Sequence, residues 1–360
     1  MKKILSVLTA LLLAFGLFTS PVLASEPKKL NIVTTIFPEY DWVRQILGDN
    51  AQNANITLLL DKGVDLHNYQ PTADDIVKIS MADLFIHVGG VSDAWVDDVV
   101  EAATNKNLVV VDLVEVLGDI VQNEKVVEGM QEVHHEHEEE HEHEEEHEHE
   151  EEHEHEEEHE HEEEHEHEEE HQHEEEHEHD HEHEHLDEHV WLSLKNAKII
   201  VEHIAKVLGE LDATNADIYT KNASSYISEL DALDAQYKEV VDAAKTKTIL
   251  FGDRFPFRYL ADDYGLDYYA AFTGCSAESE ASFETIIFLA NKVDELGLTS
   301  VLSIEGANHK IAETVIQNTK NKNQNKLVLN SMQSVTADFL DNTYLNIMKE
   351  NLEVLKQALN

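Results

Sequence analysis

The chain has 360 residues, of which 76 are Asp or Glu and 25 are Lys or Arg, so its formal net charge is −51. Residues 132–188 hold 34 of the acids, and the remaining 42 still outnumber the 25 bases. Such an acidic body attracts cations and argues against nucleic acid as a partner. Cys275 is the only cysteine, which excludes a disulfide framework.

Residues 1–24 have the pattern of a secretory signal peptide. Lys2 and Lys3 precede an apolar run over 4–18, and the small-residue sequence at 22–24 ends in Ala24, a plausible cleavage site. The apolar run is too short to span a membrane. We expect an exported protein, periplasmic or at the cell surface, with no lipid-accepting cysteine beside the cleavage site.

The first half of the mature chain alternates between strand and helix patterns. Strands are expected at 30–37, 56–60, 84–88 and 108–111, and helices at 40–47, 73–80 and around 95–103. This alternation predicts a parallel sheet with helices on its faces. Ligands bind such sheets in the loops beyond the carboxyl ends of the strands. His67 lies in such a loop, after the second strand.

The stretch 134–185 consists almost entirely of His and Glu, with a six-residue period, and holds 20 of the chain's 25 histidines. Imidazole with neighbouring carboxylates binds divalent transition metals, so the tract predicts several weak, interchangeable sites for them. It has no apolar residues to offset the entropy of ordering, and we expect it to be disordered. A solvated acidic spacer is the alternative, but it leaves the density of histidine unexplained.

The second half repeats the alternation of strands and helices after two consecutive helices. Helices are expected at 196–208 and, without Gly or Pro, at 216–244; strands follow at 248–251, 268–272, 301–304 and 327–329, and helices at 257–264, 282–296, 310–318 and 337–358. The fold class is therefore α/β, with two lobes, each a mostly parallel sheet flanked by helices, joined by one long rigid helix. The expected parts are a signal peptide (1–24), an N-terminal metal-binding lobe (25–133 and 186–214), a disordered His/Glu loop (134–185), a linking helix (215–245) and a C-terminal lobe (246–360).

Five histidines lie outside the tract: His67, His87, His189, His203 and His309. His87 falls inside a strand and His203 on a helix, where structural roles are expected. The other three lie in loops or strand–helix junctions of the two lobes, which predicts a metal site between the lobes. A closed zinc site needs four N, O or S ligands.

Two motifs resemble the metal-ligand motifs of the solute-binding proteins of zinc and manganese ABC transporters. They are Gly63–Thr72 (GVDLHNYQPT) and Glu188–Ser193 (EHVWLS), and the opening Thr34–Val43 is similar to that family's first strand and helix. A His/acid-rich loop before the second motif is typical of the family's zinc-specific branch. The resemblance covers essentially the whole mature chain. It implies one metal ion in an interlobe cleft, with His67 and His189 as the ligands from the first lobe.

The second lobe departs from the family pattern. A His or Glu ligand usually follows its first strand, but this chain has Gly252 at the aligned position, with Asp253 one step on and Arg254 beside it. The manganese-type members place an acid shortly after the strand that here ends near Glu305, and His309 falls at about that place. His67, His189 and His309 therefore form the expected core set.

The remaining ligand stays open between Asp253 and Cys275, with Glu280 behind both. Asp253 could instead form a structural ion pair with Arg254, and a lone cysteine is usually a small buried apolar residue. In a loop facing the cleft, however, Cys275 would bind zinc strongly as the thiolate. A mostly histidine set favours Zn2+ over manganese.

The expected function is therefore capture of Zn2+ with high affinity outside the cytoplasm. The resemblance implies delivery to an ABC permease with a cytoplasmic ATPase, by a monomer that is not an enzyme. The alternatives are a zinc store or chaperone that relies on the tract, a manganese-type transport protein, and a zinc hydrolase. The hydrolase is disfavoured because no His-Glu-x-x-His occurs outside the repetitive tract and no Gly-x-Ser-x-Gly elbow is present.

Overall fold

The computed structural model describes residues 29–131, 186–276, 280–306 and 308–360. The expected signal peptide (1–24) and the His/Glu tract (134–185) lie outside the described residues. Among the described helices, none combines the length and the apolar character that a membrane span requires.

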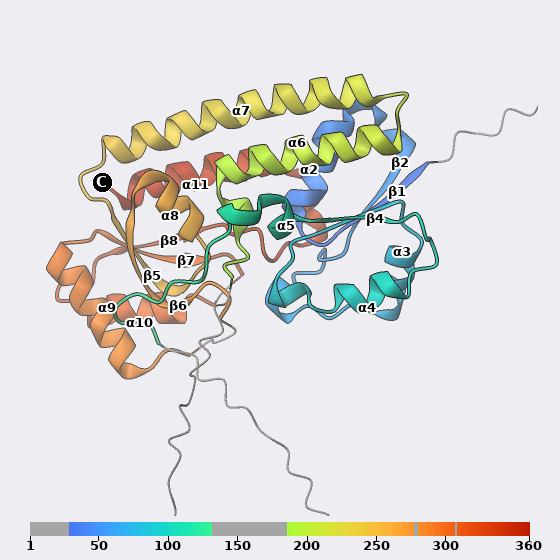
Figure 1. Cartoon of the computed structure of the whole chain (residues 1–360). Coiled ribbons are helices and arrows are strands. Elements are labelled where there is room, and N and C mark those ends of the chain that lie inside the picture. The colour runs from blue at the N-terminus through green and yellow to red at the C-terminus, as the bar shows by residue number, and fades with distance from the viewer. Residues whose placement is uncertain (1–28, 132–185, 277–279, 307) are drawn as a thin grey trace, which may run out of the picture.

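A four-stranded parallel sheet forms the centre of the first lobe (Figure 1). Its strands, in the spatial order β2-β1-β3-β4, are β2 (Ala54–Leu58), β1 (Leu30–Thr34), β3 (Leu84–His87) and β4 (Val109–Asp112). Strand β1 pairs with both β2 and β3, which brings Ile32 opposite Leu84. Strand β3 is buried along its whole length because helices cover both faces of the sheet.

Helices cover both faces of this first sheet (Figure 1). They are α2 (Phe37–Leu47), α3 (Ala73–Ser80), α4 (Val96–Glu101), α5 (Leu113–Leu117) and α6 (Leu194–Leu211). Thr72 caps α3 in a reciprocal pair, because its hydroxyl accepts from the Asp75 N–H while the Asp75 carboxylate accepts from the Thr72 N–H. The short α5 falls outside the expected helices; its start is fixed by Asp112, which accepts from the Glu115 N–H at 2.9 Å.

The second lobe repeats the same plan with a second parallel sheet, in the spatial order β6-β5-β7-β8. Its elements are β5 (Thr248–Phe255), α8 (Arg258–Tyr264), β6 (Asp267–Thr273), α9 (Phe283–Leu296), β7 (Ser300–Ile304), α10 (Lys310–Asn318), β8 (Asn325–Leu329) and α11 (Tyr344–Ala358). Strand β5 runs past its expected end at 251, and its pairing with β6 is irregular between Phe251 and Arg254. The two parallel sheets with flanking helices confirm the predicted fold class.

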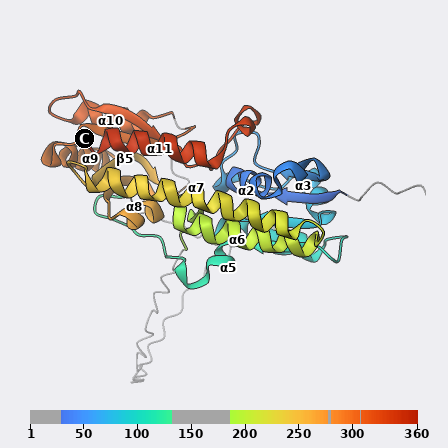
Figure 2. The same cartoon turned by 90° about the horizontal axis from the view of Figure 1, so that it is seen from above.

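Helix α7 (Ala216–Asp242) lies along both lobes (Figures 1 and 2). Its buried side chains recur every three or four residues and include Tyr219, Tyr226 and Tyr237. Toward its start, α7 packs on α2 and α6, and toward its end on α8 and α11. Near that end the buried Tyr237 hydroxyl donates to the Met348 carbonyl at 2.6 Å.

The segment expected to form one final helix over 337–358 is divided in two. Ala337–Asp341 forms a 3-10 helix, and α11 starts afresh at Tyr344. The division follows from capping, because the Thr343 hydroxyl accepts from the Asn346 N–H at 3.2 Å and the Tyr344 N–H donates to Asp41 at 2.9 Å. The second of these contacts joins the start of α11 to the first lobe.

Candidate metal centre

His67 is positioned by a single 3-10 turn, Leu66–Asn68, in the loop that follows β2. The Asp65 carboxylate caps this turn by accepting from the His67 N–H at 3.0 Å. Leu66 anchors the turn in the core, where it is fully buried. The loop also contacts the second lobe, because the Gly63 N–H donates to the Val335 carbonyl at 2.7 Å.

His189 immediately precedes a buried 3-10 turn, Val190–Leu192. The apolar side chains of this turn are completely buried, and so is the His189 ring. The Trp191 indole N–H donates to the Ser331 carbonyl at 2.8 Å, which fastens the turn to the loop after β8. The ring of His189 is therefore held between the two lobes.

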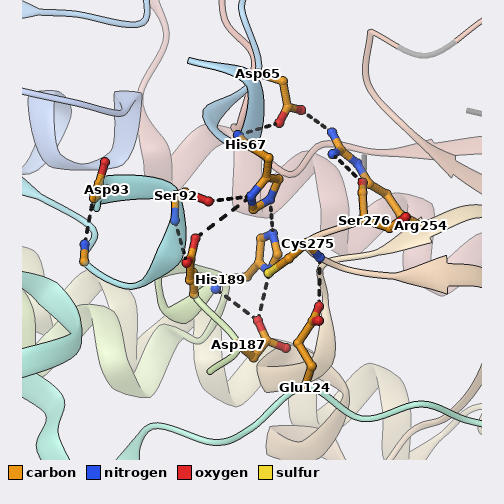
Figure 3. A network of polar contacts seen from close by, with 12 residues as sticks. Asp65, His67, Ser92, Asp93, Glu124, Asp187, His189, Arg254, Cys275 and Ser276 are labelled. Atoms are coloured by element: carbon orange, nitrogen blue, oxygen red, sulfur yellow. Dashed lines mark hydrogen bonds and ion pairs between the residues drawn. The ribbon is translucent and has the colours of Figure 1, made fainter. Parts of the chain in front are cut away.

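The two imidazoles point at each other, and Cys275 lies beside them (Figure 3). The Nε2 atoms of His67 and His189 are 3.1 Å apart, and the ring planes are inclined at 65°. One ring nitrogen of each histidine and the Cys275 sulfur form a group whose three atoms lie within 4.8 Å of one another. Two nitrogens that share a tetrahedral zinc at about 2.0–2.1 Å lie about 3.3 Å apart, so this spacing fits one ion.

The outer nitrogen of each ring is already occupied (Figure 3). His189 Nδ1 lies 2.8 Å from Asp187 Oδ1, and His67 Nδ1 lies 2.7 Å from the Ser92 hydroxyl. Because a carboxylate only accepts hydrogen bonds, His189 carries its proton on Nδ1 and turns the lone pair of Nε2 toward the site. A metal-binding histidine is commonly oriented by a carboxylate in this way.

The surroundings shift the pKa values of the two histidines in opposite directions. Burial, followed by the charges of His189 and Arg254, holds the pKa of His67 well below its usual range. Burial also acts to lower the pKa of His189, but the hydrogen bond and charge of Asp187 together with the charges of Glu188 and Glu124 outweigh it, and the net shift is upward. In the ion-free protein, His67 is thus ready to bind a cation, whereas a proton competes at His189.

Cys275 reaches the site from the loop that follows β6. The backbone N–H of Cys275 donates to Glu124 Oε1 at 2.8 Å, across to the segment that precedes the tract. Gly274 lies directly against His189, where a β-carbon would come within 2.8 Å of the ring. Burial raises the pKa of the Cys275 thiol, and the nearby carboxylates of Glu124, Asp187 and Glu188 raise it further. The thiol is therefore protonated in the absence of a cation.

Arg254 joins the two sides of the site (Figure 3). Its guanidinium forms an ion pair with Asp65, the residue that caps the turn carrying His67. The same group donates to the Ser276 carbonyl at 3.2 Å, next to Cys275. One side chain of the second lobe thus fixes the loops that present a histidine and a cysteine.

The structure brings together three of the five residues expected at the site and places Asp253 and His309 elsewhere. Asp253 accepts from the Arg254 and Ile304 N–H groups at 2.9 and 3.3 Å, so backbone contacts occupy its carboxylate. His309 starts α10 in the left-handed conformation, with its Nδ1 2.7 Å from the Ser303 hydroxyl. Both line a neighbouring cavity of about 380 Å³ whose wall includes residues of both lobes.

Close packing explains why the aligned position in β5 carries no ligand. A β-carbon on Gly252 would come within 2.4 Å of the Ala312 backbone in α10. A side chain there would therefore force the strand and the helix apart.

Sequence reasoning missed the residues that orient the ligands: Asp187, Ser92 and Arg254. A local pattern points to Asp187, because an Asp side chain commonly accepts a hydrogen bond from the backbone N–H two residues further on. Here the Asp187 carboxylate accepts from the His189 N–H at 3.0 Å. No local pattern points to Ser92 or Arg254. Ser92 contacts His67, and Arg254 contacts Asp65, only because the tertiary fold brings them together.

The chain is similar in sequence to known proteins of zinc uptake. The sequence model of the family described as "ZnuA: Zinc-uptake complex component A periplasmic" matches residues 32–358. The zinc-binding lipoprotein AdcA of Streptococcus pneumoniae is 30% identical over 360 residues, which cover 99% of this chain and 61% of that protein. The chain thus spans about three-fifths of the length of that relative.

Two further similarities extend over nearly the whole of both proteins. The high-affinity zinc uptake system protein ZnuA of Bacillus subtilis is 28% identical, over 93% of this chain and 89% of that protein. The crystal structure of the Zn(II)-bound ZnuA-like domain of Streptococcus pneumoniae AdcA superposes with a TM-score of 0.63 at 26% identity, over 92% of this chain and 99% of that domain. The match of the family model over residues 32–358 shows that the chain belongs to the ZnuA family, component A of zinc-uptake complexes.

Proposed function

We propose that the protein binds one Zn2+ ion outside the cytoplasm through His67, His189 and Cys275. The observation that carries the proposal is the pair of Nε2 atoms 3.1 Å apart, with the outer nitrogen of each ring held by another residue. Two lone pairs directed at each other at that distance repel unless a proton or a cation lies between them. A cation also explains the nearby sulfur.

The ligand set supports zinc over manganese. Two imidazoles and a thiolate suit zinc, whereas manganese prefers carboxylate and water oxygens. The sequence had left manganese-type transport open. A site that uses Cys275 in place of Asp253 or His309 disfavours that alternative, because sulfur is the least suitable of these ligands for manganese.

In this proposal both lobes contribute ligands to the site. In this proposal residues 25–133 with 186–214 form the lobe that carries His67 and His189, and residues 246–360 form the lobe that carries Cys275. The loaded protein then delivers the ion to an ABC permease whose ATPase partner works inside the cell. Support for this step comes from the family and from the relatives named for zinc uptake.

The decisive experiment measures zinc binding by the exported protein with and without the tract at 134–185. We expect the tract-deleted protein to hold one zinc tightly, and His67→Ala or His189→Ala to abolish this binding. The variant His203→Ala, on α6, serves as a matched control and should bind as the parent does. Loss of all tight binding on deletion of the tract would instead indicate a zinc store that uses the tract itself.

A further inference from the structure

Residues 121–131, called the strap from here on, follow the first lobe's β4 and α5 in the chain but lie against the second lobe. All of them are described, and they form neither a helix nor a strand. Figure 1 shows the strap running from α5 to the second lobe beside α9. A segment that leaves one lobe and is fastened to the other limits how the loops between the lobes can move.

The start of the strap is tied to α8 and to the residue that orients His189. The Gln122 N–H donates to the Tyr259 hydroxyl at 3.0 Å, and Arg258 donates to the Gln122 side-chain oxygen at 2.8 Å. The Tyr259 hydroxyl in turn donates to the Asp187 carbonyl at 2.9 Å, and the Asp187 N–H donates to the Gln122 carbonyl at 2.8 Å. The strap, α8 and Asp187 therefore form one hydrogen-bonded unit beside the candidate metal centre.

The middle of the strap holds the loop that carries Cys275. Glu124 Oε1 accepts from the Cys275 N–H at 2.8 Å (Figure 3). A hydrogen bond to a carboxylate is stronger than one between two neutral groups. Movement of Glu124 away from this loop therefore removes a contact that fixes the position of the sulfur.

The end of the strap is fastened to the edge of the second sheet and to the start of α9. The Gln131 N–H donates to the Ala271 carbonyl of β6 at 2.9 Å, and the Gln131 side-chain oxygen accepts from the Ser282 N–H at 2.8 Å. Strand β6 is the outermost strand of its sheet, so its outer side is free to take this contact.

Gly129 determines how closely the strap fits on α9. Its φ is +84°, and a β-carbon there would come within 2.0 Å of the Phe288 ring. Any side chain at this position must push the strap away from α9 or displace the ring. The position therefore offers a way to detach the strap without altering a group at the candidate metal centre.

The two histidines of the centre are closed off from solvent. The side chain of His67 is 5% exposed and that of His189 is completely buried. An ion therefore reaches their Nε2 atoms only when part of the surrounding wall moves.

The strap is well suited to be the part that moves. Within it only Met130 is buried, and Val126 is 55% exposed. Segments with few buried apolar contacts and without helix or strand pairing open locally at a much lower cost than the core. Detaching the strap also releases the hydrogen bond that holds the Cys275 loop.

We propose that the strap is the gate of the zinc site: it closes the site while it holds the Cys275 loop, and its detachment from β6 and α9 admits and releases the ion. This inference rests on the proposed function, because the ion that passes is the one held by His67, His189 and Cys275. A closed site exchanges its ion slowly, so a protein that passes the ion on needs a part that opens.

The test uses Co2+ as the probe in the full chain. Cys275 is the only cysteine, so the thiolate-to-Co2+ absorption reports the proposed site, whereas cobalt held by His and Glu alone gives no such band. Rapid mixing with excess Co2+ measures the association rate. Displacement of bound Co2+ by excess Zn2+ measures the dissociation rate.

Gly129→Ala should raise both rates by about tenfold, the effect expected from losing one or two hydrogen bonds of the strap. Cobalt affinity should change less than either rate, because the two increases partly cancel. Gly297→Ala, at the end of α9, is the matched control. Gly297 also has a positive φ, of +63°, but a β-carbon there meets nothing within 4 Å, so both rates should stay as in the parent.

A second background separates displacement of the strap from strain in its backbone. Phe288→Ala removes the ring that a β-carbon at position 129 would strike. Adding G129A to F288A should therefore change the rates much less than G129A does in the parent. Amide hydrogen exchange of the ion-free proteins checks detachment without any metal, since the Gln131 and Cys275 amides should exchange faster in G129A.

The outcomes distinguish this inference from the proposed function. Gln131→Pro, which lacks both the N–H that binds Ala271 and the oxygen that accepts from Ser282, also detaches the strap and replaces G129A if that variant does not fold. Unchanged cobalt rates in these variants would mean that the ion enters elsewhere, such as through the cavity beside Asp253, and overturn the inference. A faster dissociation alone, or loss of the band, would show that the strap only holds Cys275 and would overturn it too. If the parent itself gives no thiolate-to-Co2+ band, the proposed site has failed.

Discussion

The sulfur of Cys275 distinguishes the proposed site from one built of imidazole and carboxylate alone. Replacing Cys275 with Ser changes one atom and keeps the size of the side chain. Because a hydroxyl is a much poorer ligand than a thiolate, we expect zinc affinity to fall by more than the roughly 10–100-fold typical of losing an outer-sphere partner. Cadmium, a softer ion, should lose more affinity than zinc. Competition titrations with both ions measure this, and equal affinities before and after the change would remove Cys275 from the site.

Asp187 offers a test of ligand orientation without touching a ligand. In Asp187→Asn the carboxylate no longer fixes the proton of His189 on Nδ1, and we expect zinc affinity near neutral pH to fall roughly 10–100-fold. The raised pKa of His189 should also fall, since the hydrogen bond and charge of Asp187, with the charges of Glu188 and Glu124, raise it. The pH at which zinc binding begins to weaken should therefore move downward. A pH series of zinc titrations gives both quantities, and an unchanged pH profile would assign Asp187 a purely structural role.

At the scale of single residues, candidate ligands that lie in local motifs could be named from the sequence more readily than those whose position depends on the tertiary fold. His67 lies in a short turn and His189 directly precedes one, and the residues of these turns adjoin the histidines in the chain. Part of the surroundings of each histidine could therefore be predicted from the sequence. Which of Cys275, Asp253 and His309 lies next to these histidines depends on how the loops of the second lobe are oriented toward the first lobe. Strand β5 packs so closely on α10 at Gly252 that the position aligned with the family's ligand has no side chain, and no local pattern indicates such a close approach.

At the scale of elements, the Arg254–Asp65 ion pair connects the loop after β2 with strand β5. We expect Arg254→Met and Asp65→Asn each to lower zinc affinity, since each frees the turn that presents His67. The double variant should lose less than the sum of the two single losses, because both changes remove the same contact. Zinc affinities of all four proteins complete the cycle.

A matched control for this cycle is the pair Lys326–Glu313, a solvent-accessible ion pair of the second lobe with a 2.6 Å contact. Removing it should leave zinc affinity unchanged. Fully additive losses at Arg254 and Asp65 would show that the two residues act on the site independently.

The elements themselves followed from the sequence, with several differences in their bounds. Helix α2 starts at Phe37, inside the expected strand 30–37, because proline is well tolerated in the first turn of a helix. The alternation of strands and helices gave both sheets, since buried parallel strands are short apolar runs between amphipathic helices. The final helix is divided because Thr343 caps a new start, and β5 is longer because its end pairs irregularly with β6. The brief α5 is too short for its periodicity to be recognised.

For the whole molecule, the proposed site predicts a definite dependence on pH. Zinc requires both histidines neutral and Cys275 ionised. His189 has a raised pKa, so protons begin to displace zinc from it above the ordinary histidine value of about 6.5. The raised pKa of the thiol means that binding expels its proton. We expect calorimetry in buffers of different ionisation enthalpy to show proton release on binding at neutral pH, and affinity to fall steadily on acidification.

The ion-free protein should respond to pH differently, because its two histidines have opposite shifts. His189 contributes stability that is present below the unfolded-state pKa and is lost as the pH rises through its raised folded value. His67, with a lowered folded pKa, destabilises the fold as the pH falls below the unfolded-state value. Removing His67 as His67→Ala should therefore make ion-free stability less sensitive to acid. Denaturant titrations across this range measure the effect, and an unchanged acid sensitivity would contradict it.

The two-lobe architecture was accessible from the sequence, but the way the lobes meet was not. The alternation of strands and helices repeats on either side of the long helix, so two sheets could be counted. Contacts between the lobes join residues far apart in the chain, such as Trp191 with Ser331 and Arg254 with Asp65. Such pairs leave no periodic pattern, and they decide which loops share the site.

Helix α7 has a mechanical consequence for the exchange of the ion. It contains neither glycine nor proline, and at about 1.5 Å per residue its 27 residues extend roughly 40 Å. Asn222 fastens it to the Ile46 carbonyl in the first lobe at 2.9 Å, and Tyr237 fastens it to the Met348 carbonyl in the second at 2.6 Å. A wide hinge motion between the lobes would have to break one of these attachments or bend the helix. Helix α7 therefore opposes large movements of one lobe against the other. We expect an ion at the proposed site to enter and leave through small displacements of the loops around it.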